Sequence, residues 1–294
     1  MKVAIFGQYY QNSTEPIIRD IFLFFLKNDV ELVIEHDFLQ LLHEKNLVSK
    51  PYPTFNIANG LDSSFDILIS IGGDGTILRA ATFVKDSGVP ILGINAGRLG
   101  FLANVQKDNI ATFLQIVIKK NYTVSERSLV SISCEPENSA FSSLNFAMNE
   151  VTVSRKDTTS MITIETYLND EFLNSYWADG LIISTPTGST GYSLSCGGPV
   201  LTPSVKSLVI TPIAPHNLNA RPLVIPDDTV IKLKVSGREE NYLVALDSRI
   251  ASVKNESVLT ITKTPFTIKM VEIQNETFLK TLRNKLLWGE DKRN

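Results

Sequence analysis

Cysteine and histidine are scarce in this sequence. Only two cysteines, Cys134 and Cys196, and three histidines occur among 294 residues. The two cysteines lie far apart, and neither stands at metal-ligand spacing from another cysteine or from a histidine. The sequence therefore does not indicate a zinc site. We expect both cysteines to be reduced thiols, as is usual in cytosolic proteins.

The sequence also lacks an excess of charge and long apolar runs. It has 28 basic and 31 acidic residues, so no global positive field would attract nucleic acid or an anionic membrane. The N-terminus reaches polar residues before a signal-peptide core could form. The most apolar helical stretch, residues 17–26, is interrupted by Arg19 and Asp20 and is shorter than the ~20 residues of a membrane span. We expect a soluble, cytoplasmic protein in which any phosphate recognition is local.

The first hundred residues predict an α/β domain. The whole chain, with 294 residues and 43% apolar content, is long enough for two hydrophobic cores, and we expect the first of them here. Short β-rich runs alternate with amphipathic helical segments, which is typical of βαβ units on a parallel sheet with flanking helices. We expect strands at 2–6, 30–34, 65–71 and 90–94. A first helix, capped by Ser13 or Thr14, should bury Ile17, Ile18, Ile21, Phe22, Phe25 and Leu26.

The rest of the chain predicts a second, all-β domain and a final helix. After a helix at 110–119, short alternating runs from residue 122 to about 273 are separated by Asn, Asp, Gly and Pro, as in a β-sandwich. Residues 276–287 regain helical periodicity, with Phe278, Leu279, Leu282, Leu286 and Leu287 on the apolar side. We therefore divide the chain into an α/β domain (1–105), a β-sandwich domain (106–273) and a C-terminal helix (274–294) that packs on the first domain.

The segment Gly72-Gly73-Asp74-Gly75-Thr76 joins the strand at 65–71 to a helix. Such a junction directs free N–H groups and the positive end of the helix dipole outward, and glycine lets a phosphate approach the backbone. This predicts an anion site. Asp74 would repel the anion, which suits a general base acting on an attacking hydroxyl, or a ligand for Mg²⁺. The alternative is that Asp74 only caps the helix.

Two further segments carry polar groups at the ends of strands. Residues 178–193 run from an apolar strand into hydroxyls and glycines, which suit phosphate oxygens or ribose hydroxyls at close range. A run of this kind can also be only a loop. Asn149 and Glu150 place an amide beside a carboxylate, able to read the edge of an adenine or a ribose, or simply forming a solvated strand end.

In this order, the segments resemble the NAD kinase family over nearly the whole chain. The matching pieces are GGDGT at 72–76, INAGRLGFL at 94–102, NE at 149–150, ADGLIISTPTGSTGYSLSCGGPVL at 178–201, PIAPHNLNARPLVIP at 212–226 and the ALD stretch ending at Asp247. GGDG also occurs in lipid kinases and phosphofructokinases, whereas DGLIISTPTGSTGYSLS is specific. The resemblance implies that the chain transfers the γ-phosphoryl group of ATP to the 2'-hydroxyl of the adenosine ribose of NAD, giving NADP.

The resemblance also implies roles for individual residues. Asp74 would be the general base, and Gly72, Gly73, Gly75 and Thr76 would form the phosphate loop, with Arg79 near phosphate. Binding of NAD would involve Asp74, Gly75, Arg79, Asn149, Glu150, Asp179, Thr190, Gly191, Tyr192, Ser193, Leu194, Ser195 and Ala214. Many relatives carry Arg where this chain has Trp177. The resemblance implies that this position affects the choice between NAD and NADH.

The family further implies an assembly and a metal. Its members have the active site in a cleft between an α/β domain and a dinucleotide-binding β-sandwich domain. They are homodimers or homotetramers, in which a neighbouring subunit completes the pocket. Three separated histidines cannot form a zinc site, so we expect Mg²⁺ or another divalent cation to arrive with ATP, without a dedicated protein metal site.

Two other functional classes compete with this hypothesis. A lipid kinase sharing GGDGT would need an exposed apolar rim for acyl chains, whereas residues 185–190 offer small polar groups. A non-catalytic dinucleotide sensor would gain nothing from a carboxylate beside a phosphate, so Asp74 argues against it.

Overall fold

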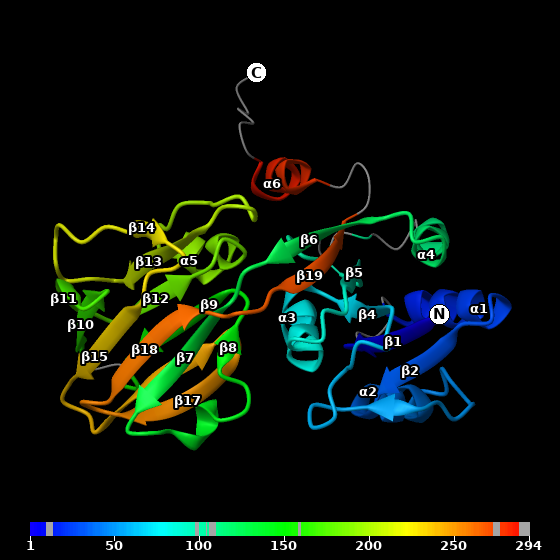
Figure 1. The fold of residues 1–294 in the computed structure, drawn as a ribbon, viewed down its shortest axis with the longest axis horizontal. Coiled ribbons are helices and arrows are strands. Elements are labelled where there is room, and N and C mark those ends of the chain that lie inside the picture. The colour runs from blue at the N-terminus through cyan, green and yellow to red at the C-terminus, as the bar shows by residue number, and fades with distance from the viewer. Residues whose placement is uncertain are drawn as a thin grey trace. The chain divides into compact units, whose positions relative to one another are not determined.

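The computed structural model describes residues 1–9, 14–97, 100–103, 105, 110–157, 160–272 and 277–287. The apolar runs near the N-terminus form parallel strands (Figure 1). They are β1 (Lys2–Gly7), β2 (Glu31–Glu35), β3 (Thr54–Phe55), β4 (Ile67–Gly72) and β5 (Ile91–Asn95), in the order β3-β2-β1-β4-β5. The four strands expected in this part are confirmed, each within about two residues of its predicted bounds; β3 was not predicted.

Helices accompany this sheet. They are α1 (Thr14–Lys27), α2 (His36–Glu44), α3 (Asp74–Val84), α4 (Ile110–Ile118) and α6 (Phe278–Leu286). One hydrophobic core joins the apolar sides of α1, α2 and α4 to the strands. No helix among the described residues is long and apolar enough to cross a membrane.

Three leucines differ from the sequence expectation. Leu26 is 54% exposed, because it follows Phe25 and is rotated about 100° away from the buried stripe of α1. On α6, Leu282 is buried, but Leu279 and Leu287 are 55% and 52% exposed. Leu287 lies past the end of the helix in a left-handed conformation, so its side chain does not continue the apolar side. The proposed cap Ser13 lies outside the described residues.

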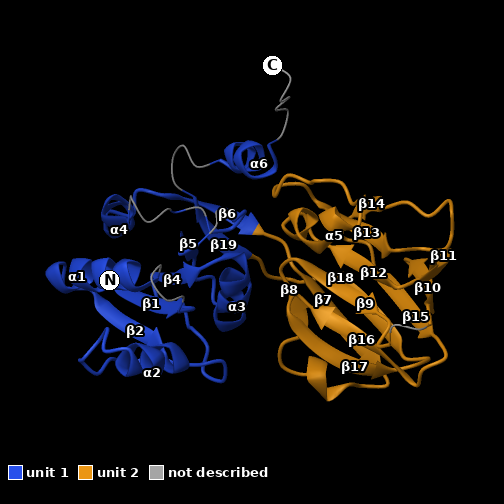
Figure 2. Cartoon of the chain, turned by 180° about the vertical axis from the view of Figure 1, so that it is seen from behind, with its two compact units in different colours: residues 1–126, 268–294 blue, residues 127–267 orange. Residues whose placement is uncertain are grey.

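The first sheet is completed by strands from distant parts of the chain. β19 (Ile268–Glu272) pairs with β5 in parallel, and β6 (Thr123–Arg127) forms the edge beyond it. The chain accordingly divides into one unit of residues 1–126 with 268–294 and another of residues 127–267 (Figure 2). These divisions differ from the boundaries drawn at 105/106 and 273/274, because the first sheet recruits β6 and β19.

The second unit consists of two antiparallel sheets around one core. One sheet has the order β11-β10-β15-β18-β7-β8 and the other β14-β13-β12-β9-β16-β17. The strands are β7 (Val130–Glu135), β8 (Phe146–Ala147), β9 (Glu150–Ser154), β10 (Ile162–Leu168), β11 (Glu171–Ala178), β12 (Gly180–Ser184), β13 (Ser207–Ile213), β14 (Leu223–Pro226), β15 (Ile231–Ser236), β16 (Asn241–Leu246), β17 (Arg249–Lys254) and β18 (Val258–Lys263). The predicted β-sandwich is confirmed.

Short helical turns interrupt the sandwich near the candidate site. They are η2 (Ser139–Phe141), η3 (Gly188–Thr190) and α5 (Tyr192–Ser195). The last two convert the predicted hydroxyl-rich loop after β12 into a compact, hydrogen-bonded segment.

Candidate active site

The GGDGT segment lies at a reversal of strand order in the first sheet. β1 has β2 on one side and β4 on the other. Such a switch point leaves a crevice for ligands beyond the carboxyl ends of the strands. The ends of β1 and β4 are tied together there: the Gln8 amide donates to the Ile71 carbonyl at 2.9 Å, and the Thr76 hydroxyl donates to Gln8 Oε1 at 3.1 Å.

Asp74 is the first residue of α3 and does not cap it. The N-cap position is Gly73, so the helix has no side-chain cap. The Asp74 carboxylate instead accepts three backbone N–H groups: Phe101 donates to Oδ2 at 2.8 Å, while Leu102 and Ala103 donate to Oδ1 at 2.9 and 3.0 Å. The helix-cap alternative is therefore wrong, because the carboxylate oxygens of Asp74 accept hydrogen bonds from residues 101–103 and not from the first turn of α3.

Two glycines allow these close contacts. A Cβ atom on Gly100 would lie 1.8 Å from Asp74 Oδ1, and one on Gly72 would lie 2.2 Å from Thr76 Oγ1. Gly73 and Gly75 differ, since a Cβ on either would meet no atom of the described part of the chain within 4 Å. The backbone beside Asp74 thus borders open space, into which the first N–H groups of α3 can point.

Asp74 also has a basic neighbour from the C-terminal helix. Lys285 Nζ on α6 lies 3.8 Å from Asp74 Oδ2 and 4.7 Å from the centre of the Phe101 ring. The Phe101 ring also lies 6.1 Å from that of Phe278 at the start of α6. Sequence reasoning missed Lys285, since nothing in its local pattern relates it to Asp74.

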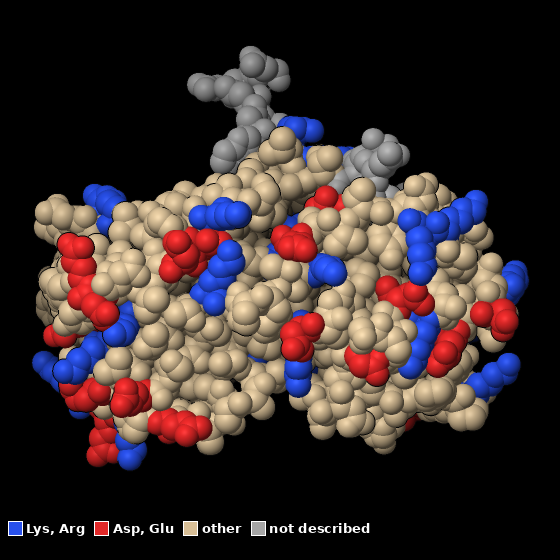
Figure 3. Space-filling view, in the orientation of Figure 1, with Lys and Arg blue, Asp and Glu red and all other residues tan. Residues whose placement is uncertain are grey.

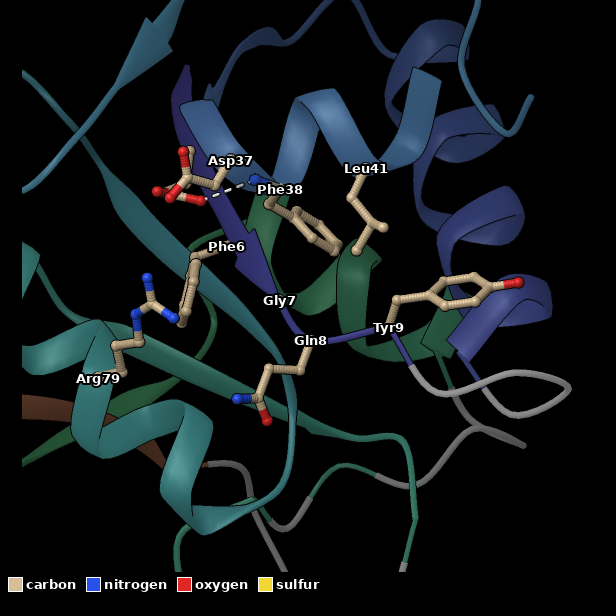
Figure 4. Close-up of a pocket in the computed structure, with 9 residues that line it drawn as sticks. Phe6, Gly7, Gln8, Tyr9, Asp37, Phe38, Leu41 and Arg79 are labelled. Carbon is tan, nitrogen blue, oxygen red and sulfur yellow. Dashed lines mark hydrogen bonds between the residues drawn. The ribbon is translucent and has the colours of Figure 1, made fainter. Parts of the chain in front are cut away.

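Arg79 lines a pocket at the carboxyl ends of β1 and β2. The pocket has a volume of about 410 Å³ and also contains Gln8, Glu35 and Asp37. Arg79 reaches from α3 toward Phe6, with its guanidinium 5.4 Å from the ring centre (Figure 4). Arg79 is therefore placed on this pocket and is not paired with Asp74.

In the second unit, a buried carboxylate organises the Asn149-Glu150 pair. Asp247 accepts the backbone N–H groups of Met148, Asn149 and Glu150 at 3.0, 2.8 and 3.2 Å. Burial raises the pKa of Asp247, while the three amides and the Arg249 charge act in the opposite direction. Three consecutive amides on one carboxylate fix the backbone at the start of β9.

The side chains of Asn149 and Glu150 lie against the loop after β12. A Cβ on Gly191 would be 3.5 Å from both Asn149 Nδ2 and Glu150 Oε2. Asn149 Oδ1 and Glu150 Oε2 are buried without a hydrogen-bond partner among the described residues. Burial, and secondly the charge of Asp247, raise the pKa of Glu150 to about 8. These polar atoms are groups that a ligand could satisfy.

Internal hydrogen bonds hold the 185–195 segment in shape. Thr185 Oγ1 donates to the Met148 carbonyl at 2.6 Å and accepts Gly188 N–H at 3.2 Å. Ser193 is fully buried and shares a hydrogen bond of 2.8 Å with the Thr211 hydroxyl. Its hydroxyl is thus directed into the core, while Tyr192 is 45% exposed. Among the other predicted residues, Ser195 is exposed, and Thr190, Gly191 and Leu194 are partly exposed.

Asp179 and Ala214 lie near each other at the ends of β12 and β13. The Asp179 N–H donates to the Ile213 carbonyl at 3.0 Å, directly before Ala214. The Asp179 carboxylate pairs with Arg155 at 3.1 Å, and sequence reasoning did not single out Arg155. Ala214 has a positive φ of 43°, so its peptide groups are turned out of the regular strand geometry.

Charge and potential metal ligands are dispersed. On the face drawn in Figure 3, Lys and Arg alternate with Asp and Glu among the described residues. Among the described residues, no three His, Cys, Asp or Glu side chains lie together in a group suited to hold a metal ion. Any strong electrostatic recognition therefore arises from local groups such as those around Asp74.

Comparisons with known proteins agree with this arrangement. A family model described as "ATP-NAD kinase N-terminal domain" matches residues 3–122, and one described as "ATP-NAD kinase C-terminal domain" matches residues 148–273. Proteins named NAD kinase from Flavobacterium johnsoniae and Flavobacterium psychrophilum are 76% and 70% identical over 294 residues, covering all of this chain and of each relative.

Two solved structures share the fold. Yeast NADH kinase complexed with NADH is 22% identical with a TM-score of 0.85, covering 99% of this chain and 88% of that one. An NAD kinase from Archaeoglobus fulgidus in complex with ATP is 26% identical with a TM-score of 0.73, covering 97% of each chain. On the strength of the family models and the full-length relatives, this chain belongs to the NAD kinase family and is a phosphotransferase enzyme.

Proposed function

We propose that this enzyme transfers the γ-phosphoryl group of ATP to the 2'-hydroxyl of the adenosine ribose of NAD, giving NADP, with Asp74 as general base. The placement of Asp74 is the observation that carries this proposal. Its carboxylate stands at the amino end of α3, is not used as a helix cap, and borders the open space beside Gly73 and Gly75. A helix N-terminus of this kind favours bound phosphate.

We propose that Oδ2 is the oxygen of Asp74 that accepts the proton. A carboxylate has about four acceptor positions, two on each oxygen. Oδ1 already accepts two N–H groups, from Leu102 and Ala103, whereas Oδ2 accepts one, from Phe101. Oδ2 therefore retains a position for the ribose hydroxyl, and the amide contacts hold the carboxylate while it waits for substrate.

The reaction then proceeds by displacement at phosphorus. The 2'-oxygen forms a bond to the γ-phosphorus, the bond from that phosphorus to the bridging oxygen of ATP breaks, and ADP leaves. The proton of the 2'-hydroxyl passes to Asp74 Oδ2 and is later released to water. Because little covalent chemistry is required of the protein, positioning and charge neutralisation provide most of the catalysis.

We propose that NAD binds to polar atoms of the second unit that lack a hydrogen-bond partner among the described residues. Asn149 Oδ1 and Glu150 Oε2 are buried and without a protein partner among the described residues, so a ribose hydroxyl or an adenine edge would satisfy them. With a pKa of about 8, Glu150 is mostly protonated at neutral pH and can donate a hydrogen bond. The same proposal includes Asp179, Ala214 and the 190–195 segment, in which Ser193 supports the others from the core.

For phosphate, we propose the backbone of Gly72, Gly73 and Gly75, with Arg79 contributing from its pocket. The Thr76 hydroxyl is engaged with Gln8, so Thr76 would act by fixing the loop. A divalent cation would enter with ATP, since Mg²⁺ commonly binds one or two carboxylates together with substrate phosphates. Asp74 is the carboxylate beside the open space, and the cation would supply neutralisation of phosphate charge.

We further propose a homodimer or homotetramer located in the cytoplasm. The edge strand β14 exposes Leu223 and Val224 by 36% and 44%, and Leu218 nearby in sequence is 88% exposed, which suits burial in an interface. Both cysteines are free thiols, as is usual for proteins of that compartment. Light scattering at several protein concentrations measures the subunit number.

The Asp74→Asn variant tests the assignment of the base. We expect turnover of NAD with ATP and Mg²⁺ to fall at least about 100-fold, because general-base catalysis is typically worth that much. NAD affinity, measured by calorimetry, should stay within about tenfold, or ~1.4 kcal/mol. Asp86→Asn is the matched control, since Asp86 is exposed beyond the other end of α3, and it should keep full turnover.

Thermal unfolding of Asp74→Asn must be measured as well. The asparagine NH₂ would face a backbone N–H donor, so the segment 101–103 would lose part of its hydrogen bonding to residue 74. If turnover persists, or if NAD binding and turnover fall together in a folded variant, Asp74 is not the base.

A further inference from the structure

Lys285 is the basic side chain that the fold brings to the predicted base. It lies in the last turn of α6, more than two hundred residues from Asp74 in the sequence, yet its ammonium is 3.8 Å from Asp74 Oδ2. The two side chains are 35% and 29% exposed, so both can be reached from solvent by a substrate.

The packing of α6 accounts for the position of Lys285. Phe278, at the start of the helix, packs on Phe101, and the Lys285 ammonium lies over the same ring at 4.7 Å. A cation held on an aromatic face near a carboxylate is favoured electrostatically. Phe101 is also the residue whose N–H binds Asp74 Oδ2. One short segment therefore orients both the carboxylate and the ammonium.

At this distance, Asp74 does not occupy the donors of Lys285. At 3.8 Å the pair is beyond hydrogen-bond length, so the contact with Asp74 uses none of the three N–H donors of the ammonium. A lysine whose only role was to pair with Asp74 would be expected to donate to it directly. The ammonium is instead placed as a nearby charge.

The chemistry at Asp74 defines what this charge would meet. If Oδ2 takes the proton of the attacking hydroxyl, the hydroxyl oxygen lies about 2.6–3.2 Å from Oδ2. The phosphorus being transferred becomes bonded to that oxygen. Because Lys285 Nζ lies 3.8 Å from the same Oδ2, the hydroxyl oxygen is at most about 7 Å from the ammonium, and on the Lys285 side of Asp74 the phosphoryl oxygens come within its reach.

We propose that Lys285 binds the phosphoryl group as it moves from ATP to the 2'-oxygen, and afterwards the 2'-phosphate of NADP. This inference rests on the proposed function, because it takes Asp74 as the base. Lys285 forms no covalent bond in this role. It offsets the repulsion between the Asp74 carboxylate and the phosphate, as cationic side chains do at transferring phosphoryl groups.

The test compares the affinities of two ligands that differ by one phosphate. In Lys285→Met, we expect the affinity for NADP, measured by calorimetry, to fall about tenfold, or ~1.4 kcal/mol, while the affinity for NAD changes less than about twofold. In steady-state kinetics, kcat should fall about tenfold with little change in KM for NAD. Lys285→Arg should recover most of both effects, because it keeps the charge.

Arg283→Met is the matched control. Arg283 is an exposed basic residue in the same last turn of α6, and its replacement should leave the ratio of NADP to NAD affinity unchanged. Unfolding curves for all variants separate loss of folding from loss of the contact.

Two results would overturn the inference. One is an unchanged ratio of NADP to NAD affinity in folded Lys285→Met, and the other is an equal fall in that ratio for Arg283→Met. Failure of the proposed function is a separate outcome, in which Asp74→Asn retains turnover; the affinity ratio in Lys285→Met is measured without turnover and does not depend on that result.

Discussion

At the scale of residues, the position of Asp74 depends on the absence of a side chain at Gly100. The Gly100 Cα lies so close to the carboxylate that a Cβ would stand 1.8 Å from Oδ1, far inside any allowed contact. Glycine is thus required here by space, and the three amides of residues 101–103 can close on Asp74 only because of it.

Gly100→Ala should consequently misplace the base. We expect kcat to fall about 100-fold, as is typical when a reacting group moves by about 1 Å, with a loss of about 1–3 kcal/mol in the free energy of unfolding. Gly97→Ala, three residues earlier, is the control, because a Cβ there would meet no atom within 4 Å among the residues that the structure describes. Equal kcat values for the two variants would contradict the spatial argument.

Glu150 makes stability depend on pH. Its pKa is raised in the folded protein from 4.5 to about 8. Between these values the folded chain holds a proton that the unfolded chain has released, so the free energy of unfolding falls as pH rises. This contribution is fully present below about pH 4.5 and is lost as the pH passes about 8.

The replacement Glu150→Gln should remove that dependence. Between pH 5 and pH 8 the folded chain binds roughly one proton more than the unfolded chain. Urea unfolding over this range should show the wild type losing stability relative to the variant, by at most about 1.4 kcal/mol per pH unit. Glu171→Gln serves as control, since Glu171 is exposed and its replacement should leave the wild-type slope. Parallel curves for wild type and Glu150→Gln would mean that Glu150 titrates normally in the folded state.

At the scale of elements, the two units hold a loop in the same way. In each unit one carboxylate collects three consecutive backbone N–H groups: Asp74 binds residues 101–103, and Asp247 binds residues 148–150. Hydrogen bonds to a charged acceptor are stronger than neutral ones. Each carboxylate thereby fixes a loop that would otherwise be free to move.

The helix α6 is the element whose importance was least visible in the sequence. Its apolar positions predict an amphipathic helix, and the helix exists. However, Leu279 and Leu287 stay exposed, and the contacts that bring α6 to Asp74 come from Phe278 and Lys285. Helical periodicity identifies a face of a helix, but it does not identify the partner of that face.

At the scale of the molecule, the first unit is discontinuous in sequence and the second is continuous. β19 lies between β5 and β6 in the first sheet, and its Val271 belongs to the core of that unit. Without residues 268–294, β6 would lose its neighbour, and β5 would keep only its short bridge from Ile94 to Val105 in place of the pairing with β19. The core of the second unit is formed entirely by residues between 130 and 261.

The two units should therefore behave differently as fragments. We expect residues 127–267 alone to unfold cooperatively in urea, because their core is complete. Residues 1–126 alone should lack a cooperative transition, and a peptide of residues 268–294 added in excess should restore it. Cooperative unfolding of the 1–126 fragment without that peptide would show that β19 is dispensable.

Much of the molecule follows from local sequence. Buried β-rich runs predicted β1, β2, β4 and β5, and the switch to alternating runs predicted the sandwich, because burial on one or both faces leaves a periodic record in the chain. The short strand β3 and the return of β19 to the first sheet leave no such record. Strand order and pairing depend on segments far apart, so the domain boundaries shifted.

For the candidate site, the sequence determined which chemical groups are present: a carboxylate among glycines, an amide beside a carboxylic acid, and a run of hydroxyls. Only the tertiary structure decided where the acceptors of Asp74 point, that Gly100 must be glycine, and that Lys285 lies beside the base. The physical reason is that hydrogen bonds and ion pairs act over a few ångströms in space, and local sequence pattern does not encode which distant residues come within that range.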